Sequence, residues 1–220
     1  MPLEAARLHV FSDFDGTITA EDTLVFLARR LGGGADHVRE SERLLRERRL
    51  TPREVIARDV GGIRAPFAEA AALLRAEVAI DPGFAPFACW CAARGIPLTV
   101  LSAGFEEIVA LYLPPAEFPA LDMRANRFRP GSWDCCFRDA SPFGHDKTAA
   151  LHEARRRGRQ VVMVGDGSSD EEPAAVADLV FARRGWSLAD WCRTRAIACE
   201  EFDTFHDVQR GVAERLGAAG

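Results

Sequence analysis

Short apolar segments that alternate with longer helical stretches constrain the fold of this chain most. The β-prone segments 8–14, 98–101 and 160–164 each lead into polar residues. Strands that alternate with helices predict a parallel sheet with helices on both faces. More than 80 residues separate the first two segments, far more than one crossover helix requires. We therefore predict an α/β fold, a Rossmann-like parallel sheet core with an inserted helical cap.

The insertion has helical periodicity and no convincing strand. Apolar residues recur at helical spacing after Asp22, and a Gly-Gly-Gly run ends that pattern. Thr51 precedes a proline and lies three residues before Glu54, which is the signature of a capping box at a helix start. The predicted domains are a catalytic core, residues 1–20 and 80–220, and a helical cap, residues 21–79.

The rest of the chain continues the alternation. Residues 114–144 read as irregular, with Pro, Gly and possible short strands. Further helices are predicted at about 65–78, 84–94, 104–112, 145–157 and 203–216, with a last short strand at 178–181.

Composition excludes several functional classes. Hydrophobic residues make up 48% and charged residues 28%, as in ordinary globular proteins. A formal charge of −5 gives no polybasic face for nucleic acid or anionic membrane. No apolar run approaches the roughly 20 residues that span a bilayer, and residues 1–9 lack a signal-peptide pattern. We expect a cytoplasmic monomer or homodimer without nucleic-acid or membrane partners.

The six cysteines lack C-x-x-C spacing and read as reduced, partly buried thiols. The vicinal pair Cys135–Cys136 is the exception to note, because it could be redox-sensitive or bind a soft metal.

Polar residues follow three predicted strands. Asp13 and Asp15 end the first, Ser102 follows the second, and Asp166 and Asp170 follow the third. Because ligands of open parallel sheets bind at the carboxyl ends of the strands, these side chains are expected at one crevice.

The carboxylates suggest a metal. Asp13 and Asp15 are alternate residues of an extended segment, so both would face one site and repel each other unless a cation joins them. Asp166 and Asp170 add two carboxylates in a glycine-containing turn that also suits a helix start. Mg²⁺ prefers oxygen ligands and keeps several waters, so we predict Mg²⁺ at this crevice.

Two further segments could bind an anion. Ser102, Ala103 and Gly104 offer a hydroxyl and backbone amides to a phosphate oxygen, although Ser102 could be an ordinary N-cap. Lys147 is the single lysine among 28 basic residues and begins a predicted helix. A cation in a first helical turn opposes the helix dipole, so Lys147 needs an anionic partner, for which phosphate is suited.

The segments that contain Asp13, Ser102, Lys147 and Asp166 resemble, in this order, the motifs of the haloacid dehalogenase-like (HAD) superfamily. The resemblance implies that Asp13 is the nucleophile and a Mg²⁺ ligand. It implies that Asp15 is a general acid and then base, whose backbone carbonyl also binds Mg²⁺. An alkoxide leaving group needs the proton that Asp15 can donate, whereas a halide would not, which argues against dehalogenation.

The resemblance also assigns the remaining motif residues. Ser102 and Lys147 would hold the transferring phosphoryl group. Asp166 would bind Mg²⁺, and Asp170 would support the metal shell or Lys147. The helical insertion is similar to the cap of the phosphoserine phosphatase-like branch.

Within that branch the chain looks closest to 2-hydroxy-3-keto-5-methylthiopentenyl-1-phosphate phosphatases. The resemblance rests on residues 12–19 followed by Asp22, and on residues 178–183. The sequence departs from that pattern at 168–173 and 130–145, which leaves the substrate open.

The insertion is expected to bind the rest of the substrate. Acidic Glu21 or Asp22 could recognise an amino group, as the resemblance to phosphoserine phosphatase implies. The candidate residues are Glu21, Asp22, Phe26, Arg48, Arg49 and Arg58.

The sequence thus predicts a Mg²⁺-dependent phosphomonoesterase that acts on a small phosphorylated metabolite through an aspartyl-phosphate on Asp13. The alternatives are a phosphoserine phosphatase, a phosphotransferase or phosphomutase, and a non-catalytic regulatory protein of the same fold.

Overall fold

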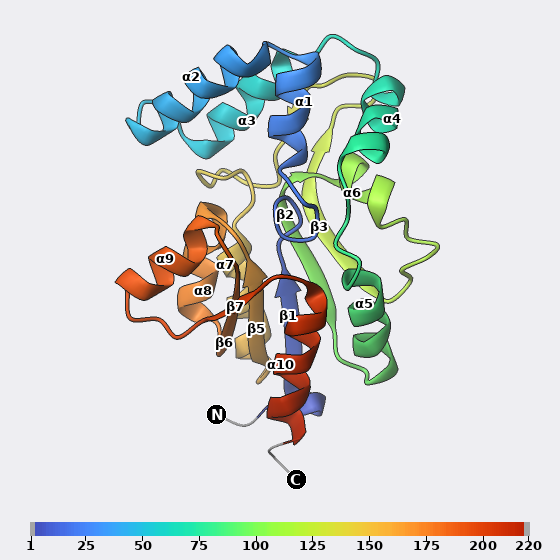
Figure 1. The fold of residues 1–220 in the computed structure, drawn as a ribbon, viewed down its shortest axis with the longest axis vertical. Helices are drawn as coiled ribbons and strands as arrows, with labels where there is room; N and C mark the ends of the chain where they lie inside the picture. The colour runs from blue at the N-terminus through green and yellow to red at the C-terminus, as the bar shows by residue number, and fades with distance from the viewer. Residues whose placement is uncertain (1–2, 218–220) are drawn as a thin grey trace.

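The computed structural model describes residues 3–217 and places its strands in one sheet (Figure 1). The strand order is β4-β3-β2-β1-β5-β6-β7, and every neighbouring pair is parallel except β3 and β4. The strands are β1 Leu8–Ser12, β2 Leu98–Phe105, β3 Leu121–Phe128, β4 Cys135–Cys136, β5 Gln160–Gly165, β6 Leu179–Arg183 and β7 Glu200–Phe202.

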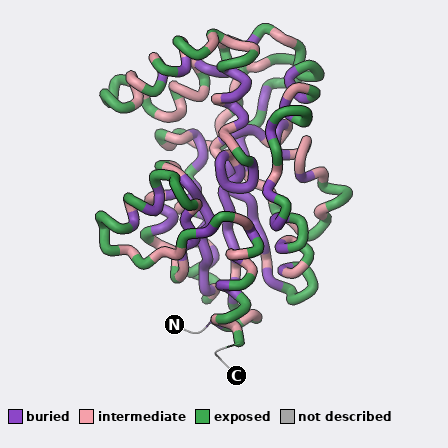
Figure 2. Tube along the Cα trace, in the orientation of Figure 1, coloured by how far each residue is buried: buried purple, intermediate pink, exposed green. Residues whose placement is uncertain are grey.

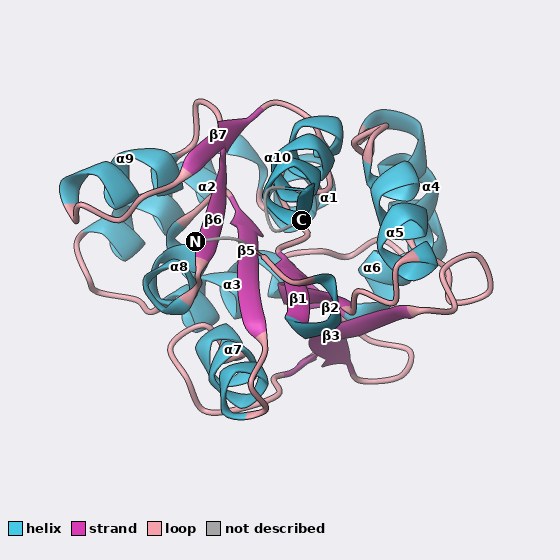
Figure 3. Ribbon diagram, turned by 90° about the horizontal axis from the view of Figure 1, so that it is seen from below, coloured by secondary structure: helices cyan, strands magenta, loops and turns pink. Residues whose placement is uncertain are grey.

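Helices cover both faces of this sheet (Figure 3). The helices are α1 Thr23–Leu31, α2 Gly34–Arg46, α3 Pro52–Gly61, α4 Phe67–Glu77, α5 Phe84–Ala93, α6 Glu106–Tyr112, α7 Lys147–Arg156, α8 Glu171–Val176, α9 Ser187–Thr194 and α10 Phe205–Gly217, with short 3₁₀ turns η1 Ala5–Arg7 and η2 Ser168–Asp170. The predicted α/β class and parallel sheet are confirmed.

Alternation along the central strands explains why both faces are buried. Val10 of β1 and Val162 of β5 pack on the face that α5 and α10 cover. Their neighbours Phe11 and Val161 pack on the opposite face, against Leu151 of α7. A strand that buries both faces reads as a continuous apolar run, which is the pattern of β1 and β5 in the sequence. Figure 2 shows the buried strands at the centre of the molecule.

Helices α1–α3 lie beyond the carboxyl end of the sheet, whereas α4 runs back beside α6 (Figure 1). The predicted capping box is present, with Thr51 and Glu54 bonded reciprocally at the start of α3. The two ends of the inserted segment lie side by side, because Ala20 N donates to Ala79 O and Thr19 bridges to Ile80. The domain boundaries themselves stay a prediction.

The region 114–144 is more ordered than predicted. It contains the eight-residue strand β3, which pairs with β2 over most of its length. Its sequence, Leu-Asp-Met-Arg-Ala-Asn-Arg-Phe, has no β-branched residue, and its partial burial removes the apolar signal. Helix α9 and the charged edge strand β7 were also not predicted.

No helix in residues 3–217 combines the length and apolar character needed to cross a bilayer. The cytoplasmic location and the monomeric or homodimeric state stay predictions.

Candidate active site

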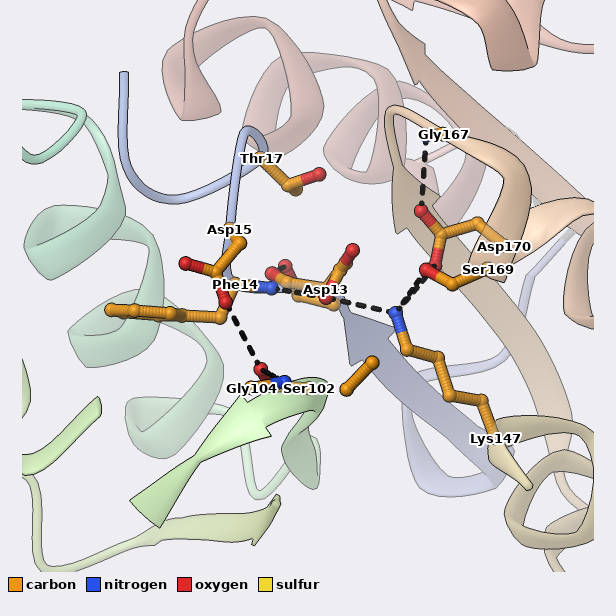
Figure 4. Close-up of polar contacts among 12 residues, drawn as sticks. Asp13, Phe14, Asp15, Thr17, Ser102, Gly104, Lys147, Gly167, Ser169 and Asp170 are labelled. Carbon is orange, nitrogen blue, oxygen red and sulfur yellow. Dashed lines mark hydrogen bonds and ion pairs between the residues drawn. The ribbon is translucent and has the colours of Figure 1, made fainter. Parts of the chain in front are cut away.

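Polar side chains gather at the carboxyl ends of three neighbouring strands (Figure 4). Asp13 follows β1, Ser102 lies near the end of β2, and Asp166 follows β5. The sheet order β2-β1-β5 brings them to one place, and Asp13 N donates to Val164 O at 2.9 Å. The structure therefore brings together the strand-end residues that the sequence predicted to meet.

Asp13 is a buried carboxylate with a cation beside it. Its side chain accepts a hydrogen bond from Phe14 N at 2.6 Å, and its Oδ1 lies 2.8 Å from Lys147 Nζ. Burial raises the pKa of Asp13 well above its usual range; Asp170 adds to this, and Lys147 opposes it. The ion pair with Lys147 thus favours the charged carboxylate that burial disfavours.

Lys147, the first residue of α7, is 2% exposed and reaches three oxygens. Its Nζ lies 2.8 Å from Asp13 Oδ1, 2.8 Å from Asp170 Oδ1 and 2.9 Å from Ser169 Oγ. Burial lowers the pKa of Lys147, but the two carboxylates outweigh it and leave the pKa above its usual value. The anionic partner predicted for this lysine is therefore a pair of aspartates in the free protein.

Asp170 orients the turn after β5. Its Oδ2 accepts hydrogen bonds from the backbone amides of Asp166 at 3.1 Å and Gly167 at 3.3 Å. A Cβ on Gly165 would lie 2.4 Å from the same oxygen, so only glycine fits there. Both oxygens of Asp170 are therefore occupied by Lys147 and the turn.

Asp166 completes a group of three carboxylates. One oxygen each from Asp13, Asp166 and Asp170 lies within 4.8 Å of the others. Burial raises the pKa of Asp166 to about 7, Asp170 adds to this, and a 2.7 Å hydrogen bond from Thr17 Oγ1 opposes it. Clustered carboxylate oxygens are suited to a hard divalent cation, which would stabilise the charged forms of Asp13 and Asp166 against the burial that raises their pKa values.

The carboxylate of Asp15 lies outside that group, on the side of Ser102 (Figure 4). Its Oδ1 accepts hydrogen bonds from the backbone N and the hydroxyl of Thr23, and Ser102 Oγ donates to its Oδ2 at 3.3 Å. Burial raises the pKa of Asp15, while the bonds from Thr23 oppose this. A Cβ on Gly104 would lie 2.7 Å from Asp15 Oδ2, so Gly104 makes room for this carboxylate.

Ser102 is not the N-cap of a helix, which the sequence had left open. Strand β2 continues past Ser102 to Phe105, and α6 begins only after it. The register of β2 with β3 shifts between Leu101 and Phe105, which places a bulge at Ser102. Ser102 Oγ accepts a hydrogen bond from Gly104 N at 2.8 Å, and the Ser102 carbonyl lies 2.9 Å from His145 Nδ1. The bulge turns the serine hydroxyl toward Asp15.

A cavity of about 250 Å³ separates Asp13, Asp15 and Asp166 from the inserted helices, and neither Ser102 nor Lys147 is part of its lining. Its sheet wall is formed by Asp13, Asp15, Ala103, Gly104, Phe143, Asp166, Gly167, Ser168 and Ser169. Its helical wall is formed by Asp22, Leu24, Val25, Val38, Glu42, Leu45, Pro52, Val55, Ile56 and Asp59. The volume suits a small metabolite rather than a polymer.

Of the insertion residues proposed from the sequence, only Asp22 lines this cavity within residues 3–217. Asp22 also caps α1, accepting hydrogen bonds from Leu24 N and Val25 N at 2.9 Å. Phe26 is buried in the core, and Arg48 and Arg49 are exposed beyond the end of α2. The other two candidates, Glu21 and Arg58, also lie outside the lining.

Sequence reasoning missed four residues that contact the site. Thr17, Thr23 and His145 bond to Asp166, Asp15 and the Ser102 carbonyl, and Asp59 lines the helical wall. Thr17 and His145 stand beside recognised motifs, so proximity to them was an available signal. Thr23 and Asp59 carry no local signal, because only the packing of the insertion brings them to the cavity.

Cys135 and Cys136 form β4, at the edge of the sheet. Burial raises the pKa of Cys135 to about 12, so this residue is a protonated thiol at neutral pH. Thiolate chemistry at Cys135 is therefore not favoured.

Comparison with known proteins gives several similar chains. The chain is 34% identical to Pdp3-interacting factor 1 of Schizosaccharomyces pombe over 93% of this chain and 94% of that protein. It is 29% identical to polyol phosphate phosphatase PYP1 of Saccharomyces cerevisiae, covering 94% and 93%. It is 27% identical to a 2-hydroxy-3-keto-5-methylthiopentenyl-1-phosphate phosphatase of Brevibacillus brevis, covering 93% and 94%.

The fold is also similar to a solved phosphoserine phosphatase, determined as an analogue of its phospho-aspartyl intermediate. The TM-score is 0.71 at 19% identity, covering 94% of this chain and 99% of that one. The profile of the haloacid dehalogenase-like hydrolases matches residues 10–172, which include every motif residue named above. The predicted family and enzyme class are confirmed: the chain belongs to the haloacid dehalogenase-like hydrolases.

Proposed function

We propose that this protein is a Mg²⁺-dependent phosphomonoesterase that acts on a small phosphorylated metabolite through an aspartyl-phosphate on Asp13. The observation that carries the proposal is the position of the Asp13 carboxylate at the end of β1. It lies 2.8 Å from the buried Lys147 and lines the same cavity as Asp15. A nucleophile, a cation for phosphoryl oxygens and a proton donor therefore share one small site.

The donor set is suited to Mg²⁺. Asp13 and Asp166 would hold the ion with the backbone carbonyl of Asp15, and Asp170 would support them. When bound, Mg²⁺ supplies positive charge against the phosphoryl oxygens and the clustered carboxylates.

The reaction would take place in two displacements at phosphorus. A carboxylate oxygen of Asp13 attacks phosphorus, the bond from phosphorus to the ester oxygen breaks, and Asp15 donates its proton to the departing alkoxide. A water then attacks the aspartyl-phosphate while Asp15 takes its proton. The bond from phosphorus to Asp13 breaks, so inorganic phosphate leaves, Asp13 is again a carboxylate and Asp15 is again protonated.

Other residues in the site would position the phosphoryl group. Ser102 Oγ, the backbone amides near Ala103 and Gly104, and Lys147 Nζ are the available donors. Lys147 pairs with Asp13 in the free protein, which keeps its ammonium group beside the nucleophile. The raised pKa of Asp15 suits its first role, because a general acid must carry a proton at neutral pH.

The relatives suggest two substrate classes. One similar protein is named a polyol phosphate phosphatase and another a phosphatase of a methylthiopentenyl phosphate. The cavity of about 250 Å³ suits either size of leaving group. We propose a polyol-type phosphate as the first candidate and the methionine-salvage enol phosphate as the second, with residues 21–79 acting as the cap over the cavity.

The test is phosphate release from a panel of both substrate types, phosphoserine and p-nitrophenyl phosphate, with Mg²⁺ and with EDTA. Wild-type protein should release phosphate only with Mg²⁺, and Asp13→Asn should lose at least about 10,000-fold in kcat, as expected for removal of a nucleophile. Acid-quenched wild-type protein should carry one phosphoryl group on the peptide that contains Asp13. Full activity of Asp13→Asn would overturn the mechanism, and transfer to an added alcohol in preference to water would indicate a phosphotransferase.

A further inference from the structure

The charged residues of the helical wall are all acidic. Most of that wall is apolar, with Val38 and Leu45 from α2 and Val55 and Ile56 from α3. Asp22, Glu42 and Asp59 are its carboxylates, and no described residue that lines the cavity is Lys or Arg. A leaving group bound here would therefore meet apolar surface and negative charge.

Asp59 is the most constrained of these carboxylates. It is 4% exposed, and its Oδ1 accepts a 2.6 Å hydrogen bond from the buried hydroxyl of Ser41. His37 Nε2 lies 2.9 Å from the same oxygen. Within residues 3–217, no hydrogen bond engages the second oxygen, Oδ2.

This arrangement leaves an acceptor on a largely buried side chain that no described residue engages, and Oδ2 itself keeps access to solvent. Such an acceptor is open to a donor on a bound molecule, which exchanges a hydrogen bond to water for one to the ligand. The hydrogen bond from Ser41 holds the carboxylate from one side, which limits its rotation and orients it before ligand binds. Because Asp59 also lines the cavity, a donor on the bound ligand can reach it.

We propose that Asp59 determines substrate specificity by accepting hydrogen bonds from the leaving group, and that this leaving group is a small, hydroxylated and uncharged chain. This inference rests on the proposed phosphatase function. Hydroxyl groups supply the donors that Asp59 lacks, and their carbon chain covers the apolar residues of the helical wall.

The same wall disfavours anionic leaving groups. A carboxylate on the substrate would lie near Asp22, Glu42 and Asp59 with no cation in the lining to pair with it. Like charges held close together repel, which is a specificity device that acts against the wrong ligand. Phosphoserine carries such a carboxylate, so it is expected to be a poor substrate.

The wild-type protein tests the proposal without any substitution. Glycerol 1-phosphate and 3-phosphoglycerate have the same chain length and differ by a carboxylate. With Mg²⁺ present, kcat/KM should favour glycerol 1-phosphate by about 100-fold or more, because a site that must leave polar groups unpaired discriminates strongly. Equal values, or a preference for 3-phosphoglycerate, would overturn the proposal.

A generic substrate separates this failure from failure of the proposed function. If p-nitrophenyl phosphate is turned over but kcat/KM is higher for 3-phosphoglycerate than for glycerol 1-phosphate, only the specificity inference is overturned. Inactivity toward all three phosphates would overturn the phosphatase function and this inference with it.

A substitution then assigns the effect to one residue. Asp59→Asn keeps the size of the side chain and an acceptor for Ser41 but removes the charge. It should raise KM for glycerol 1-phosphate about 10-fold with little change in kcat, the effect expected from losing one hydrogen bond to a charged group. The ratio of kcat/KM for glycerol 1-phosphate to kcat/KM for 3-phosphoglycerate should fall about 10-fold. The matched control is Asp36→Asn on α2, where a 94% exposed carboxylate is removed outside the cavity. The ratio should not change in this control.

Stability distinguishes recognition from a purely structural role. If Asp59 only joins α2 to α3, Asp59→Asn should lower the thermal midpoint and leave both KM and the substrate ratio as in wild type, which would overturn its assignment. If the variant does not fold, the wild-type ratio still decides the proposed substrate class.

Discussion

The two walls of the cavity are built differently. On the sheet wall, polar groups from separate strands bond to one another, and Lys147 alone reaches oxygens of Asp13, Ser169 and Asp170. On the helical wall, apolar side chains of α1–α3 dominate, and Asp59 keeps an unused acceptor. The difference separates two tasks: a network that is already satisfied can position the reacting groups, whereas an unsatisfied wall can select the ligand.

The walls meet at a loop that leads into the site. Arg53, in the first turn of α3, donates to the carbonyl of Asp139 at 2.9 Å through its Nη1 and to Pro142 O at 2.7 Å through its backbone amide. Its guanidinium lies 4.5 Å from the ring centre of Phe137. The same loop continues to His145 and Lys147, so the helical wall is connected through it to the lysine that pairs with Asp13.

The largest effect is expected from Lys147→Met, which breaks the sheet-wall network. Asp13 and Asp170 would be left buried without their cation, and breaking a buried ion pair costs about 3–5 kcal/mol of unfolding free energy. Loss of the phosphoryl-binding cation should lower kcat by about 1,000-fold or more. Denaturant unfolding at pH 8 and steady-state phosphate release measure the two effects.

The matched control for this prediction is Arg155→Met on the same helix. Arg155 forms an ion pair with Asp178 at 2.8 Å, but its side chain is 42% exposed. An exposed pair contributes about 0–1 kcal/mol, so stability and kcat should change little. Equal losses of stability and kcat in Lys147→Met and Arg155→Met would contradict the view that the buried ion pairs of Lys147 matter more than the exposed pair of Arg155.

The sequence predicted the sheet wall well because its chemistry is local. Asp13, Asp15 and Asp166 stand beside apolar strands, and the rule that parallel strands present their carboxyl ends at one edge then placed them together. Strand β3 was missed because its side chains alternate poorly between polar and apolar character. Its pairing with β2 supplies the order that the local sequence lacks.

The helical wall could not be predicted in the same way. Asp59 lies in α3 and Val38 in α2, and they reach one cavity only through the angle at which the helices pack. Arginine candidates such as Arg48 and Arg58 were chosen for charge, but Arg48 lies in the turn after α2 and Arg58 lies in α3 outside the cavity lining. Polar residues occupy most of the circumference of an amphipathic helix, and tertiary packing decides which of them face the ligand.

A smaller effect is expected from Asp22→Asn on the helical wall. Burial raises the pKa of Asp22 to about 7, with Asp15 adding to this and the amides of α1 opposing it. The folded protein therefore favours the protonated acid, and this stability is lost as pH rises from the ordinary pKa toward 7. Asparagine still caps the helix and does not titrate, so the variant should gain about 3 kcal/mol relative to wild type between pH 5 and pH 8, from two pH units at about 1.4 kcal/mol each.

Thermal midpoints of both proteins in EDTA measure this difference, which should be about 6–12 °C more favourable to Asp22→Asn at pH 8 than at pH 5. EDTA removes any contribution from a cation bound by the neighbouring carboxylates. A difference that is constant with pH would show that Asp22 is ionised throughout the range, and its carboxylate would then act only as a helix cap.

The smallest effect is expected from Arg53→Ala, which weakens the contact between α3 and the loop of residues 137–145 without changing a residue that lines the cavity. The half-buried guanidinium loses one carbonyl and one aromatic partner, worth about 1 kcal/mol together, while the backbone bond to Pro142 remains. KM should rise about 5-fold and kcat should fall less, because the helical wall binds the leaving group and the sheet wall performs the chemistry. Arg39→Ala, which removes an exposed ion pair with Asp36, is the control and should leave both constants unchanged. A fall in kcat that matches or exceeds the rise in KM would mean that the loop positions Lys147 through Arg53, and the two walls would then act as one unit.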